Sequence, residues 1–105
     1  MLIHINTDAN IKGTEALVQK TEAQVRDYMA RFESRITRIE VHLSDENSDK
    51  KTGKDAMRCV LEARMANRKP IAVTHHAATI DLAVTGAAEK LEHSLTSVIG
   101  RLSNR

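Results

Sequence analysis

The neighbouring histidines His75-His76 are the residues whose type and spacing most suggest metal binding or acid–base catalysis. They end a predicted strand at residues 71–75, and adjacent side chains of a strand point to opposite faces of the sheet. The two rings therefore cannot hold one ion without a bulge. The outward-facing His4, His42 and His76 could meet across the sheet, and a small hydrolase or metal enzyme that uses His42 and His76 is the enzymatic alternative.

Neither the cysteine nor the acidic residues provide a stronger candidate for catalysis or metal binding. Cys59 is the single cysteine, and it falls on the apolar side of a predicted strand, whereas reactive thiols lie in exposed, electropositive surroundings. The group Asp45-Glu46-Asp49 lacks the glycine and terminal glutamate of a calcium loop. No nucleophile with a nearby base can be recognised, and the glycines form no phosphate-binding loop. We therefore predict no catalytic site, no metal site, no cofactor and no small-molecule substrate.

The basic side chains remain as candidates, because Lys and Arg can neutralise phosphate. The net charge is only +2, yet residues 26–38 and 58–69 contribute +2 and +3 while the rest of the chain sums to −3. Surface charge that serves solubility is the alternative explanation. Aromatic residues make up 2% of the chain, and Tyr28 and Phe32 both fall on the buried stripe of a predicted helix. Without a ring on which a base could stack, the remaining mode is recognition of folded RNA by its shape.

The elements that must position these side chains follow from hydrophobic periodicity. Strands are predicted at residues 2–6, 39–43, 57–65 and 71–75, a helix at residues 14–33, and a second helix after Thr79. Thr14 and Thr79 are expected to cap the two helices. Gly86 is expected to allow close packing against the sheet, and Gly100 to end the second helix early. Residues 44–55 are predicted to form a mobile hairpin loop.

The strands alternate between apolar and polar residues, which is typical of a sheet covered on one face only. The predicted fold is therefore an α+β two-layer sandwich in the order β-α-β-β-β-α, with a four-stranded, mostly antiparallel sheet and both helices on one face. Its 105 residues suffice for a single domain, 1–105, with one core. No apolar run is long enough to cross a bilayer, and the first residues lack a signal peptide. Together with the lone cysteine, this predicts a cytoplasmic protein.

Several segments resemble those of one bacterial family. They are Ile5-Asn6, Thr14-Glu-Ala-Leu17, Ile39-Glu-Val-His-Leu43 and, above all, Gly86-Ala-Ala-Glu-Lys-Leu-Glu-His-Ser-Leu95. The last is similar to a Gly-x-x-Asp-Lys-Leu-x-x-Gln-Leu helix segment. Over nearly its whole length the chain resembles the family of ribosome hibernation-promoting factors and ribosome-associated inhibitors, in its short single-domain form.

The resemblance implies a fold related to double-stranded-RNA-binding domains and binding to the rRNA of the small ribosomal subunit. Members of this family block the mRNA and tRNA sites and stabilise idle ribosomes in stationary or stressed cells, using basic side chains, many of them on the helices. Lys90 matches the family lysine, His93 stands where arginine is frequent, and Arg101 stands where lysine is frequent. The predicted RNA-binding residues are Lys90, His93, Arg101, Arg31, Arg35, Arg38, Arg58 and Arg64.

The chain departs from the family pattern at both ends of the last helix. Residues 79–85 lack the family's tyrosine and second aspartate, and residues 96–100 replace a lysine-rich run. These departures predict a weaker ribosome affinity or a different target. The alternative function is a protein-interaction module that no longer binds ribosomes. Val60, which points outward beside Arg58 and Arg64, suggests a homodimer through the open sheet face.

Overall fold

The four strands form one mixed sheet in the order β1-β2-β3-β4. The computed structural model describes residues 1–46 and 55–103, so most of the predicted hairpin loop, residues 47–54, lies outside the described residues. The elements are β1 (Leu2–Thr7), α1 (Glu15–Met29), a 3₁₀ turn η1 (Ala30–Phe32), β2 (Ile36–Asp45), β3 (Met57–Met65), β4 (Ile71–Ala77) and α2 (Ile80–Ser103). The predicted order of elements is confirmed.

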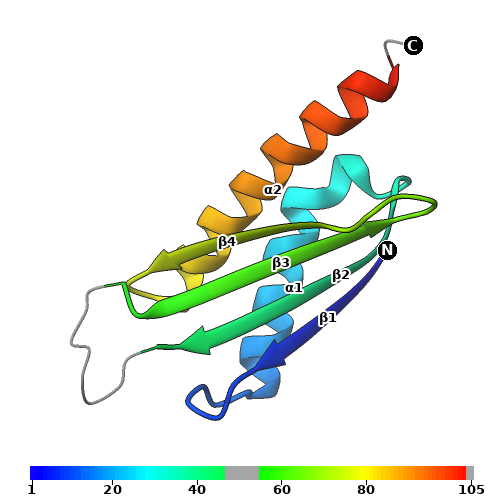
Figure 1. The fold of residues 1–105 in the computed structure, drawn as a ribbon. Coiled ribbons are helices and arrows are strands. Elements are labelled where there is room, and N and C mark those ends of the chain that lie inside the picture. The colour runs from blue at the N-terminus through cyan, green and yellow to red at the C-terminus, as the bar shows by residue number, and fades with distance from the viewer. Residues whose placement is uncertain (47–54, 104–105) are drawn as a thin grey trace.

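The sheet is antiparallel except at one edge. β1 and β2 are parallel, with α1 as the connection between them, whereas β2, β3 and β4 are antiparallel neighbours (Figure 1). Parallel neighbours need a long crossover, and the helix supplies it. In the register, Arg38 of β2 stands opposite Arg64 of β3, and Glu40 stands opposite Glu62.

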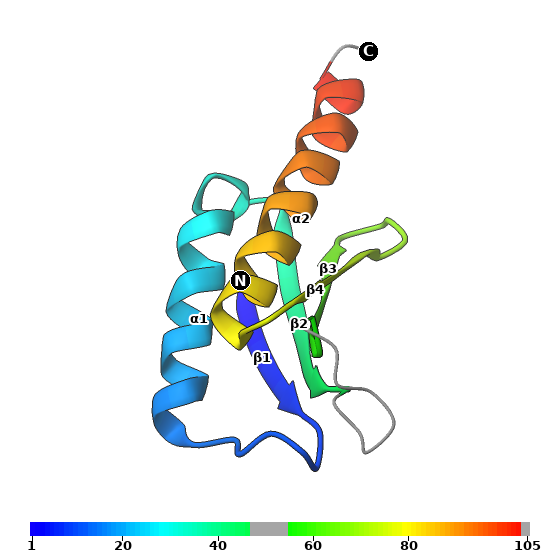
Figure 2. The same cartoon turned by 90° about the vertical axis from the view of Figure 1, so that its left-hand side faces the viewer.

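Both helices cover the same face of the sheet, as the two views in Figures 1 and 2 show. The strands turn every second side chain toward them, so Ile39, Val41 and Leu61 are fully buried. α1 contributes Val25 and Met29 to this core, and α2 contributes a long stripe. The buried residues of that stripe are Ala83, Val84, Ala87, Ala88, Leu91 and Leu95. In the described part of the chain, no helix lies on the opposite face of the sheet, and the alternation of apolar and polar residues predicts this one-sided cover.

Both helices begin where their capping residues predict. The backbone N–H of Leu17 donates to Oγ1 of Thr14, and the N–H of Leu82 donates to Oγ1 of Thr79, each at 3.1 Å. Each bond satisfies a backbone donor that has no partner within the helix. Within the described chain, neither helix is both long and apolar enough to span a bilayer.

The expectation that Gly100 ends the second helix is wrong, because α2 continues to Ser103. Glycine costs a helix interior only about 1 kcal/mol relative to alanine. The preceding Val98 and Ile99 pack against the core and hold this turn in place. β2 also begins earlier than predicted, at Ile36, because Ile36 and Arg38 still pair with Met65 and Arg64 of β3, across an irregularity in the register.

Gly86 lies where α2 packs tightly against β4. A Cβ atom built at this position would overlap the imidazole ring of His75. The expected close packing at Gly86 is therefore confirmed, and its partner is the half-buried His75.

We predict that Gly86→Ala destabilises the protein by about 1–3 kcal/mol, because the added methyl group forces the His75 ring or the helix to move. In a His75→Ala background the same change should instead stabilise the protein by up to about 1 kcal/mol, since alanine favours helix. Urea denaturation of the four proteins measures both values. An equal effect of Gly86→Ala in the two backgrounds would show that His75 is not the obstacle.

Candidate nucleic-acid interface

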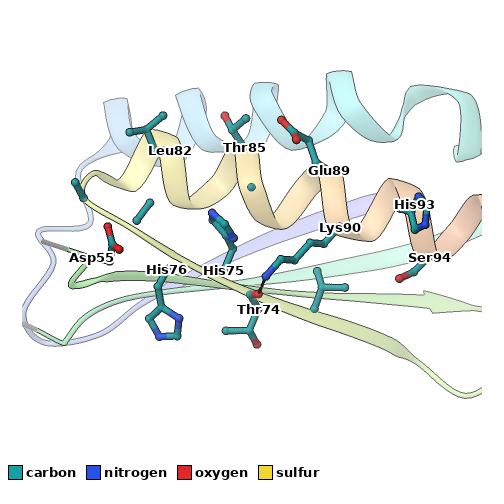
Figure 3. Close-up of a pocket in the computed structure, with 14 residues that line it drawn as sticks. Asp55, Thr74, His75, His76, Leu82, Thr85, Glu89, Lys90, His93 and Ser94 are labelled. Carbon is teal, nitrogen blue, oxygen red and sulfur yellow. Dashed lines mark hydrogen bonds between the residues drawn. The ribbon is translucent and has the colours of Figure 1, made fainter. Parts of the chain in front are cut away.

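The eight predicted RNA-binding residues lie on different surfaces of the fold and do not form one patch. One group, Arg38, Arg58 and Arg64, projects from β2 and β3 on the open face of the sheet. A second group, Arg31, Arg35 and Arg101, comes from the segment after α1 and from the last turns of α2. The remaining two, Lys90 and His93, lie on α2 beside β4 (Figure 3).

The arginines of the open sheet face are paired with glutamates. Arg38 contacts Glu40 at 2.6 Å, Arg64 contacts Glu62 at 3.0 Å, and the Nε of Arg58 lies 3.9 Å from Glu46. Arg38 and Arg64 face each other across the strands, and so do Glu40 and Glu62. Like charges in directly opposite positions repel, and the pairs along each strand offset this repulsion. Much of the positive charge on this face is therefore cancelled, and a homodimer through the face stays a prediction.

Glu40 is the most highly bonded carboxylate of this face. Nε and Nη2 of Arg38 donate to its Oε1, whereas Nδ1 of His4 lies 2.9 Å from Oε2 and Nδ2 of Asn6 donates to the same oxygen at 3.3 Å. Partial desolvation acts to raise the pKa of Glu40. The hydrogen bonds from Arg38, His4 and Asn6, together with the charge of Arg38, outweigh it and hold the pKa below its usual value.

The histidines do not converge on the open face. His4 contacts Glu40, and Nε2 of His76 lies 2.7 Å from Oε1 of Glu46. His42 pairs with Asn6 and Val60 in the sheet register. In the described part of the chain no three His, Cys, Asp or Glu side chains are placed to share a metal ion. The prediction that His75 and His76 point to opposite faces is confirmed, because the ring of His75 faces α2 and that of His76 points away (Figure 3).

Cys59 is a core residue, as the sequence predicts. Its side chain is fully buried in β3, and burial raises the pKa of the thiol to about 12. Because the thiolate is the nucleophile, this cysteine is unreactive in the folded protein.

Arg31 is held in place by two neighbours. Its guanidinium lies 4.6 Å from the centre of the Phe32 ring, and its Nη2 donates to Oγ1 of Thr96 at 2.6 Å. Thr96 in turn donates to the carbonyl oxygen of Glu92 at 2.8 Å. Stacking on an aromatic ring and a hydroxyl acceptor both suit the flat guanidinium. Arg31 is thus fixed in orientation while its charge remains uncompensated by these contacts.

A pocket of about 340 Å³ opens beside this arginine. Its walls are formed by Arg31, Phe32, Ser34, Arg35, Thr96, Ile99 and Gly100. Among the described residues, no carboxylate lies within ion-pair distance of Arg31, Arg35 or Arg101. Two guanidinium groups beside the Ser34 hydroxyl group suit a phosphate, which accepts hydrogen bonds from both kinds of donor. The Thr96 hydroxyl proton is already donated to Glu92, so Thr96 orients Arg31. Sequence reasoning missed Phe32 and Thr96 as positioning residues, since Thr96 lies 65 residues from Arg31 in the chain and no local pattern connects them.

Lys90 and His93 line a separate groove between β4 and α2. Nζ of Lys90 donates to the backbone oxygen of Thr74 at 2.8 Å (Figure 3). His93, one turn further along α2, is exposed. Within the described residues Lys90 also lacks a carboxylate partner. Among the eight predicted RNA-binding residues, those without an acidic partner in the described part of the chain therefore lie on the helical layer and its end, and the three with partners lie on the open sheet face.

Comparison with known proteins identifies the family to which the chain belongs. The family model of the sigma 54 modulation protein / S30EA ribosomal protein matches residues 3–103. The N-terminal domain of Protein Y from Thermus thermophilus has a similar structure, with a TM-score of 0.72, 19% identity and coverage of 93% of this chain and 99% of that one. A ribosomal subunit interface protein from Coxiella burnetii is similar too, with a TM-score of 0.73, 16% identity and coverage of 95% and 99%. At these identities the likeness establishes the fold. No curated protein matches closely.

The bonds of Glu40 predict a pH dependence of stability. Because the pKa of Glu40 is lower in the folded protein than in the unfolded chain, its ionised form stabilises the fold above the ordinary carboxyl pKa of 4.5. This stabilisation is lost as pH falls through the lower, folded value. The variant Glu40→Gln lacks this stabilisation. The wild type should therefore be more stable than the variant at neutral pH, and the difference in stability between the two proteins should shrink as the pH falls.

Thermal denaturation of the wild type and of Glu40→Gln, from neutral pH to below the ordinary carboxyl pKa, measures the difference in stability. Glu22→Gln is the matched control, because it removes a carboxylate from an exposed pair with Arg26 on α1 and leaves the sheet untouched. A difference between wild type and Glu40→Gln that stays constant with pH would contradict the assignment.

Proposed function

Because the chain belongs to the family of sigma 54 modulation proteins and S30EA ribosomal proteins, we propose that it is a ribosome-associated hibernation factor. In this proposal it binds the rRNA of the small ribosomal subunit in the cytoplasm and inhibits translation in stationary phase or under stress. The family match over residues 3–103 is the observation that carries the proposal. The fold shared with a protein described as a ribosomal subunit interface protein supports it.

The pattern of ion pairs suggests which cations bind RNA. A phosphate contact requires a cation that is not already neutralised, because an arginine held by a carboxylate must first give up that partner. Arg31 and Arg35 meet this requirement, and so does the predicted Arg101. Lys90 and His93 also have no carboxylate partner among the described residues, but they lie in the separate groove beside β4. The paired Arg38, Arg58 and Arg64 are expected to contribute less. The pocket beside Phe32 and Thr96 is the proposed principal phosphate site.

We predict that the protein co-sediments with small ribosomal subunits at low salt and dissociates as salt rises. Each phosphate contact adds about 0.9 to the slope of log affinity against log salt concentration on duplex nucleic acid. Sucrose-gradient sedimentation of the purified components at several salt concentrations measures this slope. A protein that stays in the top fractions even at low salt would rule out the ribosome as partner.

We further predict that Arg31→Gln/Arg35→Gln weakens this association and lowers the salt slope by about 0.9 for each phosphate that is no longer neutralised. The matched control is Arg38→Gln/Arg64→Gln, which removes the same charge from the open sheet face. It should retain most of the affinity and slope. Circular dichroism verifies that both variants are folded. If the control variant binds as weakly as the test variant, the assignment of the binding surface is wrong.

A further inference from the structure

Among the described residues, β4 has no neighbouring strand on its outer side, and this free edge lies beside the groove. The N–H of Glu46 donates to the carbonyl oxygen of Ala56 at 2.8 Å, and this bond continues the antiparallel ladder between β2 and β3. In such a ladder alternate residues bond to opposite neighbours. Even-numbered residues of β3 therefore bond to β2, and odd-numbered residues bond to β4. By the register of β3 and β4, the even-numbered Ala72, Thr74 and His76 direct their N–H and C=O groups to the free edge.

A contact of Lys90 independently supports the conclusion that the even-numbered residues of β4 direct their backbone groups to the free edge. Its Nζ reaches the carbonyl oxygen of Thr74 from outside the sheet (Figure 3). Lysines at exposed edges are one of the means by which proteins block the addition of another strand. Here the blocking group is a flexible side chain that lies on a neutral acceptor and has no carboxylate within ion-pair distance among the described residues. An acidic partner can therefore draw Lys90 away and expose the edge.

The groove beside this edge is large enough for an extended segment. Its volume is about 1080 Å³, and its walls come from β4, from one side of α2 and from Asp55, which lies at the end near Leu82 (Figure 3). Beside Asp55 this end offers apolar surface, because Leu82 is 53% exposed and Ala77 and Ala78 also line the groove. The other end carries Lys90 and His93, whereas Glu89 points away from β4 (Figure 3). Apolar surface and positive charge are thus separated along the groove.

We infer that this groove binds an extended, acidic peptide segment of another protein, which adds to β4 as a fifth strand. Addition of a strand to a free edge is a general mode of peptide recognition in which backbone bonds give affinity and side chains give specificity. The segment runs antiparallel to β4, the commoner pairing. Its aliphatic residue contacts Leu82, and its Asp or Glu binds Lys90.

The spacing of the two anchors follows from the geometry of α2. Leu82 and Lys90 are eight residues apart, which corresponds to about 12 Å along a helix. A strand covers this distance in about four residues, and an even spacing places both side chains on the same face. The expected segment therefore has an aliphatic residue followed, four positions later, by Asp or Glu.

The test uses the full chain and two capped peptides of equal composition. The probe is acetyl-Thr-Leu-Thr-Val-Thr-Glu-Thr-amide, with Leu and Glu four residues apart. The matched control is acetyl-Thr-Leu-Thr-Val-Glu-Thr-Thr-amide, in which Glu moves to the opposite face of the strand. In an NMR titration of the ¹⁵N-labelled protein, the probe should bind about tenfold more tightly than the control. It should also slow hydrogen exchange of the amides of Ala72, Thr74 and His76.

The variant Lys90→Met separates the roles of charge and backbone pairing. The wild type should bind the probe more tightly than an analogue in which Gln replaces Glu, and Lys90→Met should bind the two peptides equally. The amides of Ala72, Thr74 and His76 should still become protected in this variant. Unchanged exchange at these amides, or equal binding of probe and control, would overturn the inference. It is also overturned if a short RNA duplex, but neither peptide, perturbs the β4 amides, because the groove is then part of the RNA interface.

Discussion

The inward side chains of the four strands must all be buried beneath two helices, and the two surfaces of the molecule follow from this constraint. From Ile39 to Leu43 in β2 and from Cys59 to Met65 in β3 every second residue is buried, so the residues between them must project to the uncovered face. That face carries arginines and glutamates side by side. The helical layer presents its polar residues elsewhere, around Arg31 and along the edge of β4. The fold therefore separates two populations of cations.

The difference between these populations lies in their partners. On the sheet, strand geometry places Arg38 next to Glu40 and Arg64 next to Glu62, so that each guanidinium already has a carboxylate. Exposed pairs of this kind contribute little to stability, but they reduce the positive potential available to a polyanion. Arg31 instead contacts an aromatic ring and a hydroxyl group, which orient it without neutralising it. Orientation without neutralisation is what a phosphate site needs.

Local patterns allow the elements to be predicted, whereas contacts between distant segments do not follow from them. The alternation of apolar and polar residues predicted the bounds of β3 correctly, and the capping threonines predicted where both helices begin. Sequence could not show that Arg38 stands opposite Arg64, because register depends on pairing across the sheet. It also could not connect Arg31 with Thr96. The wrong prediction that α2 ends at Gly100 also comes from a contact between distant segments. Packing of the preceding turn against the core outweighs the low helix propensity of glycine.

The central claim is that Arg31 and Arg35, which have no acidic partner among the described residues, contact ribosomal RNA, whereas the paired arginines of the sheet do not. Modification of arginines by phenylglyoxal, followed by mass spectrometry of the free protein and of its complex with small ribosomal subunits, tests it most directly. The account predicts that Arg31 and Arg35 become protected in the complex while Arg38 and Arg64 react as in the free protein. Protection of Arg38 and Arg64, with Arg31 and Arg35 still reactive, would contradict it.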